Sequence, residues 1–268
     1  MRRHRVSAHR ARRRFGQNFL HDRSVIARIV DAVAPRSDDR VVEIGPGKGA
    51  LTGPLLERVA RLTVVEIDRD LAAALRARPE HPARLAVIES DALQLELAPL
   101  AADGPLRLVG NLPYNISTPL LFHLFAQAGL IADMHFMLQR EVVARMTAPP
   151  GSRTYGRLSV MVAWHCDAQS LFEVGPGAFN PAPRVRSAVV RLVPRRTPPC
   201  ELGDPALFAR VVAEAFMQRR KTLYNALNRR LSTDEIAACG VDAGVRPETL
   251  PVEAFARLAN AIHSKRLE

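Results

Sequence analysis

The chain has 268 residues with an ordinary apolar share of 47%, so one or two globular domains with a real core are expected. Its net charge of +11 and its pI of about 10.8 favour a polyanionic partner. The sequence has no apolar run of about 18 residues and no apolar stretch after its basic N-terminus, which argues against a membrane span and a secretory signal and predicts a cytoplasmic protein. Its three isolated cysteines, Cys166, Cys200 and Cys239, predict neither a disulfide framework nor a metal site.

The first two thirds of the chain alternate between strand and helix patterns. Residues 1–14 contain seven arginines and no acid, which predicts a flexible basic arm. Apolar residues at helical spacing, with Asp22 as a cap, then predict a helix over 23–33. Further strands are predicted over 40–44, 62–67, 85–89, 106–109 and 134–138, and further helices over 50–60, over 71–78 and after Ser117. This alternation indicates βαβ units, and therefore an α/β domain with a parallel sheet whose ligands bind where the strands end.

The last third of the chain has helical patterns only. A proline-rich segment, 194–200, has the composition of a linker. Helices are predicted after it over 208–217, 222–231, 234–239 and 252–262. We therefore expect an α/β ligand-binding and catalytic domain over 15–193 and a small all-α domain over 201–268.

A glycine-rich turn follows the first predicted strand and reads Glu43-Ile44-Gly45-Pro46-Gly47-Lys48-Gly49. Glycines at such a turn allow the backbone to approach a ligand closely. A P-loop is excluded because Lys48 is followed by glycine and not by Ser or Thr. A dinucleotide site remains open, although the third glycine comes one residue early. The whole segment matches the Glu-x-Gly-x-Gly-x-Gly pattern common in methyltransferases that use S-adenosyl-L-methionine, which favours that cofactor.

Two acidic residues lie at or just after the ends of the next two predicted strands. Glu66 lies 21 residues after Gly45, where a carboxylate can accept hydrogen bonds from both ribose hydroxyls of a nucleotide. Asp91 follows the third strand and can accept a hydrogen bond from an adenine amine. Either acid alone could equally be a helix cap or a solvated loop residue. Their succession at neighbouring strand ends, behind the glycine turn, favours a nucleotide site.

The tetrapeptide Asn111-Leu112-Pro113-Tyr114 follows the fourth predicted strand. It fits the (Asn/Asp)-x-Pro-(aromatic) motif of enzymes that methylate exocyclic amines. The adenine N6 lone pair is delocalised, so this amine needs acceptors for its N–H groups, for which the Asn111 side chain and the Leu112 carbonyl are suited. Tyr114 offers a face on which an extruded base can stack. Such a direct methyl transfer relies on positioning and electrostatics and requires no metal.

Basic residues form clusters outside the N-terminal arm. One cluster contains Arg219, Arg220, Lys221, Arg229 and Arg230, and another contains Arg184, Arg186 and Arg191. We expect the first cluster to lie on helices and to contact RNA phosphates. The alternative is a solvated face whose arginines pair with acids such as Glu214.

Four segments, in order, resemble the ribosomal RNA adenine dimethyltransferases, in a form close to those that act on the small subunit. These segments are Arg14 through Leu20, Glu43 through Gly49, Asn111 through Thr118, and Arg219 through Leu223. The resemblance covers essentially residues 14–268. It implies a Rossmann-like class I methyltransferase domain with an antiparallel final hairpin and a helical C-terminal domain. It also implies S-adenosyl-L-methionine-dependent dimethylation at N6 of two adjacent adenosines near the 3′ end of 16S rRNA, within a precursor of the small ribosomal subunit, by a monomer that acts in subunit biogenesis.

The resemblance also implies roles for individual residues. Its cofactor contacts are Gln17, Asn18, Leu20, Gly45, Gly47, Glu66, Asp91, Ala92 and Asn111. Its catalytic residues are Asn111, Leu112, Pro113 and Tyr114, with Phe179 facing Tyr114 across the target base. Arg184 stands where the family usually has lysine, and it joins Arg219, Arg220 and Lys221 as an RNA contact.

Three other functions compete with this interpretation. A 23S rRNA adenine methyltransferase of the antibiotic-resistance type shares the cofactor and tetrapeptide motifs, but the Arg-Arg-Lys-Thr-Leu segment and the Asn-Leu-Pro-Tyr form favour the small-subunit class. A non-enzymatic RNA-binding assembly factor on the same fold would not need both Asn111 and Tyr114. A nucleotide-dependent dehydrogenase would need neither the tetrapeptide nor the arginine clusters.

Overall fold

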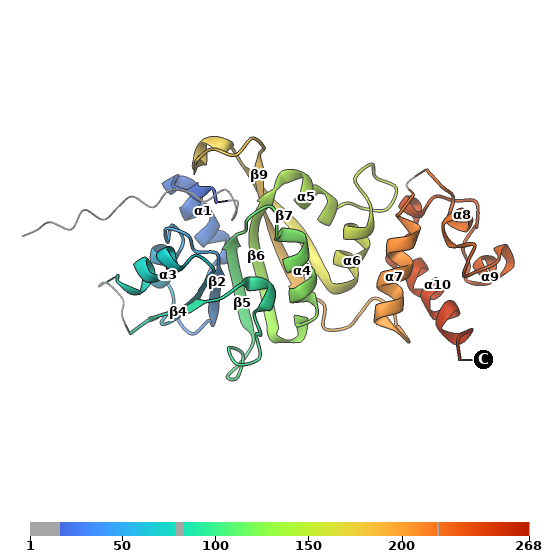
Figure 1. Ribbon diagram of the computed structural model, residues 1–268, viewed down its shortest axis with the longest axis horizontal. Helices are drawn as coiled ribbons and strands as arrows, with labels where there is room; N and C mark the ends of the chain where they lie inside the picture. The colour runs from blue at the N-terminus through green and yellow to red at the C-terminus, as the bar shows by residue number, and fades with distance from the viewer. Residues whose placement is uncertain (1–16, 79–82, 219, 268) are drawn as a thin grey trace, which may run out of the picture. The chain divides into compact units, whose positions relative to one another are not determined.

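The computed structural model describes residues 17–78, 83–218 and 220–267 (Figure 1). The predicted basic arm at 1–14 lies outside these residues. Contacts between residues divide the described chain into two units. Unit 1 comprises the described residues up to Val143 together with Gln169–Pro194, and unit 2 comprises Ala144–Ala168 and the described residues from Arg195 on.

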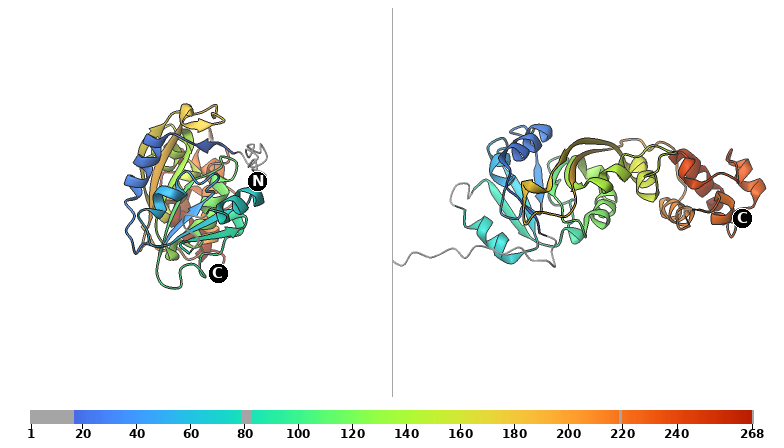
Figure 2. Two further views of the ribbon diagram at one scale, coloured as in Figure 1. Left: turned by 90° about the vertical axis from the view of Figure 1, so that its left-hand side faces the viewer. Right: turned by 90° about the horizontal axis from the view of Figure 1, so that it is seen from above.

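The centre of unit 1 is a twisted sheet (Figure 2) with the strand order β4-β3-β2-β5-β6-β9-β7. Its strands are β2 (Val41–Ile44), β3 (Leu62–Glu66), β4 (Leu85–Glu89), β5 (Leu106–Asn111), β6 (Ile131–Gln139), β7 (Cys166–Val174) and β9 (Ser187–Pro194). The strands β2 to β6 pair in parallel, whereas β9 pairs antiparallel with β6. The predicted α/β fold and its antiparallel final strand are therefore confirmed. Because the parallel strands share one direction, their carboxyl ends meet at one edge of the sheet.

Short helices connect these strands. They are α1 (Arg23–Val33), α2 (Thr52–Leu56), α3 (Arg69–Arg76), η2 (Ala92–Gln94), α4 (Ser117–Phe125) and η3 (Ala128–Leu130). Asp22 caps α1 as predicted, because its carboxylate accepts hydrogen bonds from the backbone N–H groups of Ser24 and Val25. The predicted helix over 50–60 was too long, since the residues before Thr52 belong to the glycine turn. The apolar faces of α1 and α2 pack with β2 and β3 in the core of the unit.

A second, two-stranded sheet joins distant parts of unit 1. Strand β1 (Phe19–Leu20) pairs antiparallel with β8 (Phe179–Asn180), which follows the short helix η4 (Pro176–Ala178). Neither strand was predicted, because two-residue strands leave no periodic pattern. The pairing fixes the segment around Asn18 beside the carboxyl edge of the main sheet, where Leu20 is buried in the core.

Unit 2 is helical. Its elements include α6 (Arg157–His165), α7 (Pro205–Ala215), α8 (Leu223–Leu227), α9 (Thr233–Ala238), η5 (Pro247–Thr249) and α10 (Val252–Ser264), and α5 (Arg140–Met146) spans the division between the units. Helices α6, α7 and α10 pack against one another, and Trp164 lies 5.0 Å from Phe208 between ring centroids. The unit therefore takes in residues 144–168, which the predicted domain boundaries place with the sheet. The aromatic side chain of Trp164 explains this, since it completes an apolar core that the C-terminal helices share.

No helix in the described part of the chain is long and apolar enough to cross a membrane. Within the same residues, no group of three or more His, Cys, Asp or Glu side chains could hold a metal ion.

Candidate active site

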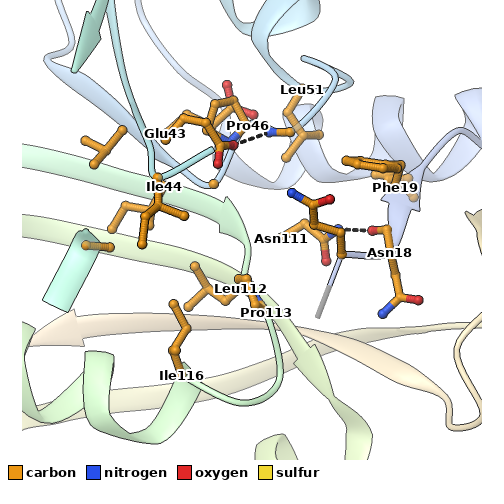
Figure 3. A pocket seen from close by; sticks show the side chains of 18 of the residues that line it. Asn18, Phe19, Glu43, Ile44, Pro46, Leu51, Asn111, Leu112, Pro113 and Ile116 are labelled. Atoms are coloured by element: carbon orange, nitrogen blue, oxygen red, sulfur yellow. Dashed lines mark hydrogen bonds between the residues drawn. The ribbon is translucent and has the colours of Figure 1, made fainter. Parts of the chain in front are cut away.

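A pocket lies at the carboxyl edge of the unit 1 sheet, and its open volume is about 150 Å³ (Figure 3). It is lined by the last residues of β2, β3 and β5, by residues that follow β2, β3, β4 and β5, and by the segment around β1. Its lining contains all nine predicted cofactor contacts, namely Gln17, Asn18, Leu20, Gly45, Gly47, Glu66, Asp91, Ala92 and Asn111. Leu112, Pro113 and Tyr114 line it as well. The structure thus brings together segments that are up to about a hundred residues apart, because parallel strands end side by side.

The glycine turn forms one wall of the pocket. Gly45 and Gly47 adopt φ angles of 68° and 56°, in the left-handed region that residues with a side chain rarely adopt. A Cβ atom on Gly47 would also lie 3.1 Å from the Phe19 ring. The turn therefore needs glycine both for its backbone conformation and for the close approach of β1.

Glu66 is buried beneath this turn, with 5% of its surface exposed. Its Oε2 atom accepts a hydrogen bond from the Gly47 N–H at 3.0 Å, and its Oε1 atom accepts one from the Asp68 N–H at 2.9 Å. Burial raises the pKa of Glu66, and these two N–H donors partly offset that effect. Each carboxylate oxygen keeps a further lone pair, so the group can still accept two hydroxyl donors from a ligand.

Glu43, at the end of β2, is a second buried acid of the pocket. Thr52 Oγ1 donates a hydrogen bond to Glu43 Oε2 at 2.7 Å. Burial raises the pKa of Glu43 to about 7, against the opposing effect of this hydrogen bond. The glycine-turn motif contains Glu43, but sequence reasoning gave the residue no role of its own. The available signal was an acid within an otherwise apolar, β-branched strand.

Asp91 lines the pocket beyond β4, and the structure shows the helix-cap role that was one of its two alternatives. Its Oδ1 atom caps η2 by accepting a hydrogen bond from the Leu93 N–H at 2.9 Å. The cap fixes the orientation of the carboxylate, which leaves the other oxygen as an acceptor for a ligand amine.

Asn111 ends β5 at the centre of the pocket. Its Nδ2 atom donates a hydrogen bond to the backbone carbonyl of Asn18 at 3.0 Å (Figure 3). A carbonyl accepts but cannot donate, so this contact determines which end of the Asn111 amide carries nitrogen. The Oδ1 atom therefore points away from Asn18 and is available as an acceptor, as the predicted role requires.

The residue before Asn111 is a glycine for a steric reason. A Cβ atom on Gly110 would lie 2.5 Å from the Ile44 carbonyl oxygen and 3.1 Å from Leu112 Cδ2. Only glycine lets β5 approach β2 this closely. Gly110 thereby places the tetrapeptide next to the glycine turn, a function that the sequence analysis missed although a glycine directly before the motif was its signal.

Tyr114 is half-buried and held at both ends. Its backbone carbonyl accepts a hydrogen bond from Ser117 Oγ at 3.0 Å. Its hydroxyl lies 2.8 Å from Ser187 Oγ on β9. Burial raises the pKa of Tyr114, whereas the contact with Ser187 lowers it. The ring is thus fixed in place at the pocket wall.

Phe179 does not line this pocket. It is 3% exposed and belongs to the apolar core of unit 1, where it pairs with Leu20 across the β1–β8 ladder. Its predicted role opposite Tyr114 across the target base therefore stays a prediction.

The predicted RNA-binding residues divide into several groups. Arg184, Arg220 and Lys221 are exposed, whereas Arg219 lies outside the described residues. The expectation that this basic segment is helical was wrong for Arg220 and Lys221, which precede α8 in a turn, because Thr222 caps that helix. Arg230 donates two hydrogen bonds to Glu214, each of 2.5 Å, as the structural alternative anticipated. Arg229 is exposed in the turn that follows α8.

Curated relatives of this chain include methyltransferases of the small ribosomal subunit. A curated relative from Chromohalobacter salexigens, "Ribosomal RNA small subunit methyltransferase A", is 56% identical over 96% of this chain and 93% of its own length. A relative of the same name from Pseudomonas aeruginosa is 55% identical over 95% of each chain.

Solved structures agree with the fold. A dimethyladenosine transferase from Plasmodium falciparum has a TM-score of 0.77 at 24% identity and covers 92% of this chain and 98% of its own. The 23S rRNA methyltransferase ErmE has a TM-score of 0.72 at 29% identity and covers 92% of this chain and all of its own. These likenesses confirm the Rossmann-like methyltransferase fold of unit 1.

A family model, "Ribosomal RNA adenine dimethylase", matches residues 8–264. This match includes the glycine turn, the tetrapeptide and the C-terminal helices, so it covers nearly all of the chain and not the sheet alone. The chain therefore belongs to the ribosomal RNA adenine dimethylase family.

Proposed function

We propose that this protein is an S-adenosyl-L-methionine-dependent methyltransferase that dimethylates N6 of two adjacent adenosines in 16S rRNA of the small ribosomal subunit. The observation that carries the proposal is the fixed orientation of the Asn111 amide in the pocket. That orientation presents an oxygen acceptor where a methyl group and an amine would meet.

The pocket residues fit the proposed cofactor. The free lone pairs of Glu66 suit the two ribose hydroxyls, and the outer oxygen of Asp91 suits the adenine amine. We expect Glu43 and Asn18, which also line the pocket, to contact the methionine end, where a cationic group of the cofactor would offset the cost of the buried Glu43 carboxylate. A dinucleotide would instead need the Gly-x-Gly-x-x-Gly spacing that this turn lacks. When bound, the cofactor supplies an electrophilic methyl group.

The tetrapeptide would act on the target adenine. Asn111 Oδ1 and the Leu112 carbonyl accept hydrogen bonds from the two N6–H groups, which localises the nitrogen lone pair for attack. Pro113 fixes the backbone of this turn. Tyr114 provides the stacking face that holds the extruded base. The protein thus contributes orientation and hydrogen-bond acceptors, and the reaction needs no nucleophilic side chain.

Two observations favour the small-subunit substrate over its alternatives. Relatives at 55–56% identity are named as small-subunit methyltransferases, whereas the 23S rRNA enzyme is 29% identical. A non-enzymatic assembly factor would not need both Asn111 and Tyr114, whereas here both residues are present and line the pocket.

The experiment that tests this function is incubation with labelled S-adenosyl-L-methionine and undermethylated small subunits, followed by nucleoside analysis. We expect N6,N6-dimethyladenosine in 16S rRNA and no label in large subunits. Label in 23S rRNA alone would favour the resistance-type activity, and binding without transfer would favour an assembly factor.

We further propose that Arg220 and Lys221 bind RNA phosphates through unit 2. Both side chains are exposed and have no acidic partner among the described residues, in contrast to Arg230. Replacing both with Gln should weaken binding to small subunits and reduce the slope of log affinity against log salt by about 0.7–0.9 per contact. An equal slope and affinity would show a solvated face only. Arg230→Gln is the matched control, because Arg230 already forms an ion pair with Glu214. This control should leave the salt dependence of binding nearly unchanged.

A further inference from the structure

Ser187 is a buried polar residue that the proposed reaction does not use directly. It begins β9, and none of its surface is exposed. Its Oγ atom lies 2.8 Å from the Tyr114 hydroxyl, although the two residues are 73 positions apart in the chain. A hydroxyl this deeply buried needs a hydrogen-bond partner, and Tyr114 supplies it.

The sheet register explains how the two residues meet. Ser187 pairs with Gln139 at the end of β6, and Asn111 pairs with Met137 on the other side of the same strand. Ser187 and Asn111 therefore lie at the same edge of the sheet, with β6 between them. Tyr114 lies in the turn that follows β5, and its hydroxyl reaches Ser187 at the start of β9.

The contact constrains a ring that carries a predicted function. Ser117 Oγ holds the Tyr114 carbonyl at one end, and Ser187 Oγ holds the hydroxyl at the other. Without Ser187, the far end of the ring would be free to tilt away from the pocket wall. A stacking face must lie in one orientation before the base arrives, since otherwise the binding of the base must also pay for the ordering of the ring.

We propose that Ser187 is a positioning residue for methyl transfer, which fixes the Tyr114 ring through its hydroxyl. The inference rests on the proposed function, in which Tyr114 stacks on the target adenine. It further implies that this hydrogen bond connects β9, and the segment before it that contains Arg184, to the tetrapeptide.

A double-mutant cycle tests this role on the full-length protein. The four proteins are the wild type, Ser187→Ala, Tyr114→Phe and the double variant, and the readouts are kcat and KM on undermethylated small subunits. We expect Ser187→Ala to lower kcat by about threefold to tenfold, the effect of one hydrogen bond, with KM for S-adenosyl-L-methionine unchanged. In the Tyr114→Phe background the same substitution should change kcat by less than about twofold, because the partner is already lost.

Two further variants separate positioning from general stability. Ser187→Cys keeps a weak donor of similar size and should recover part of the lost kcat. Ser159→Ala removes another buried hydroxyl, one that hydrogen-bonds within unit 2, and should lower the unfolding temperature without lowering kcat. All variants are first checked for an unchanged affinity for S-adenosylhomocysteine, which requires a folded unit 1.

The outcomes distinguish this inference from the proposed function. An inactive wild type would overturn the function, and the inference with it. An active wild type in which Ser187→Ala has no effect on kcat, or has an equal effect with and without the Tyr114 hydroxyl, would overturn the positioning role alone.

Discussion

The two edges of the unit 1 sheet bury acidic side chains in opposite ways. At the amino-terminal edge, Arg107 Nη1 lies 2.6 Å from Asp39, and its Nη2 lies 2.7 Å from Asp133. The same guanidinium also donates to the carbonyl of Val33 at the end of α1. At the carboxyl edge, Glu43 and Glu66 have no ion-pair partner among the described residues and accept only neutral donors.

This difference separates a structural edge from a functional one. A carboxylate paired with arginine keeps its charge at little cost. Burial raises the pKa of Asp39, but the hydrogen bond from the Arg36 N–H and the contact with Arg107 outweigh burial, so the pKa is lowered. Burial without an ion-pair partner instead raises the pKa of both pocket acids and reduces the stability of the fold, although the charge of Arg78 partly opposes this for Glu43. Such a cost is typical of sites whose missing partner is a ligand.

The largest expected effect on stability is at the amino-terminal edge. Arg107→Met leaves Asp39 and Asp133 close together and partly buried without a cation, which should lower the free energy of unfolding by about 3–5 kcal/mol. Urea unfolding at neutral pH measures this. The affinity of the folded variant for S-adenosylhomocysteine should be unchanged. A variant as stable as the wild type would contradict the claim that Arg107 stabilises the buried acids at the amino-terminal edge.

At the pocket edge, Asn111→Ala should have its main effect on catalysis. Loss of an acceptor that acts in the transition state should lower kcat by about 10²–10³, by analogy with removal of one preorganised hydrogen-bonding group from an active site. The measurement is methyl transfer at saturating small subunits. Tyr114→Ala should cost less, about tenfold or more, from lost stacking. Near-normal turnover by the Asn111 variant would contradict its assignment.

Glu43 should make the stability cost of the pocket edge depend on pH. Its folded-state pKa of about 7 exceeds its usual value of 4.5, so the folded state binds the proton more tightly than the unfolded state. Glu43 alone should therefore contribute a loss of about 3 kcal/mol of stability as the pH rises from below 4.5 to above 7. Glu43→Gln keeps an acceptor for Thr52 and removes this loss. Unfolding experiments at pH 5 and pH 8 should show a larger gain from the substitution at pH 8, and an equal gain at both would contradict the shift.

The smallest effect concerns Glu66. Glu66→Ala should weaken S-adenosylhomocysteine binding by about 1–3 kcal/mol, because two ribose hydroxyls lose a charged acceptor. Calorimetric titration measures the affinity. Because its carboxylate is buried without a cation, removing it should cost the fold much less than the Arg107 substitution does. Unchanged affinity would mean that Glu66 does not contact the ribose.

The sequence alone determined which segments form the pocket. The β-branched runs predicted the strands, and the glycine turn, Glu66, Asp91 and the tetrapeptide each follow one of them. These predictions succeeded because strand and turn preferences are local, and because parallel topology then brings the carboxyl ends together. The conformation of Gly45 and Gly47 follows from the same local chemistry.

Only the tertiary structure decided the contacts that set side-chain orientation. The Asn111 amide is oriented by a carbonyl 93 positions away, and the Tyr114 ring by a serine 73 positions away. Packing also buries Phe179 in the core. Residues 144–168 belong to unit 2 because they pack with its helices in one apolar core. No local pattern encodes such pairings, because a hydroxyl or an amide becomes a partner only where the folded chain places it within hydrogen-bond distance.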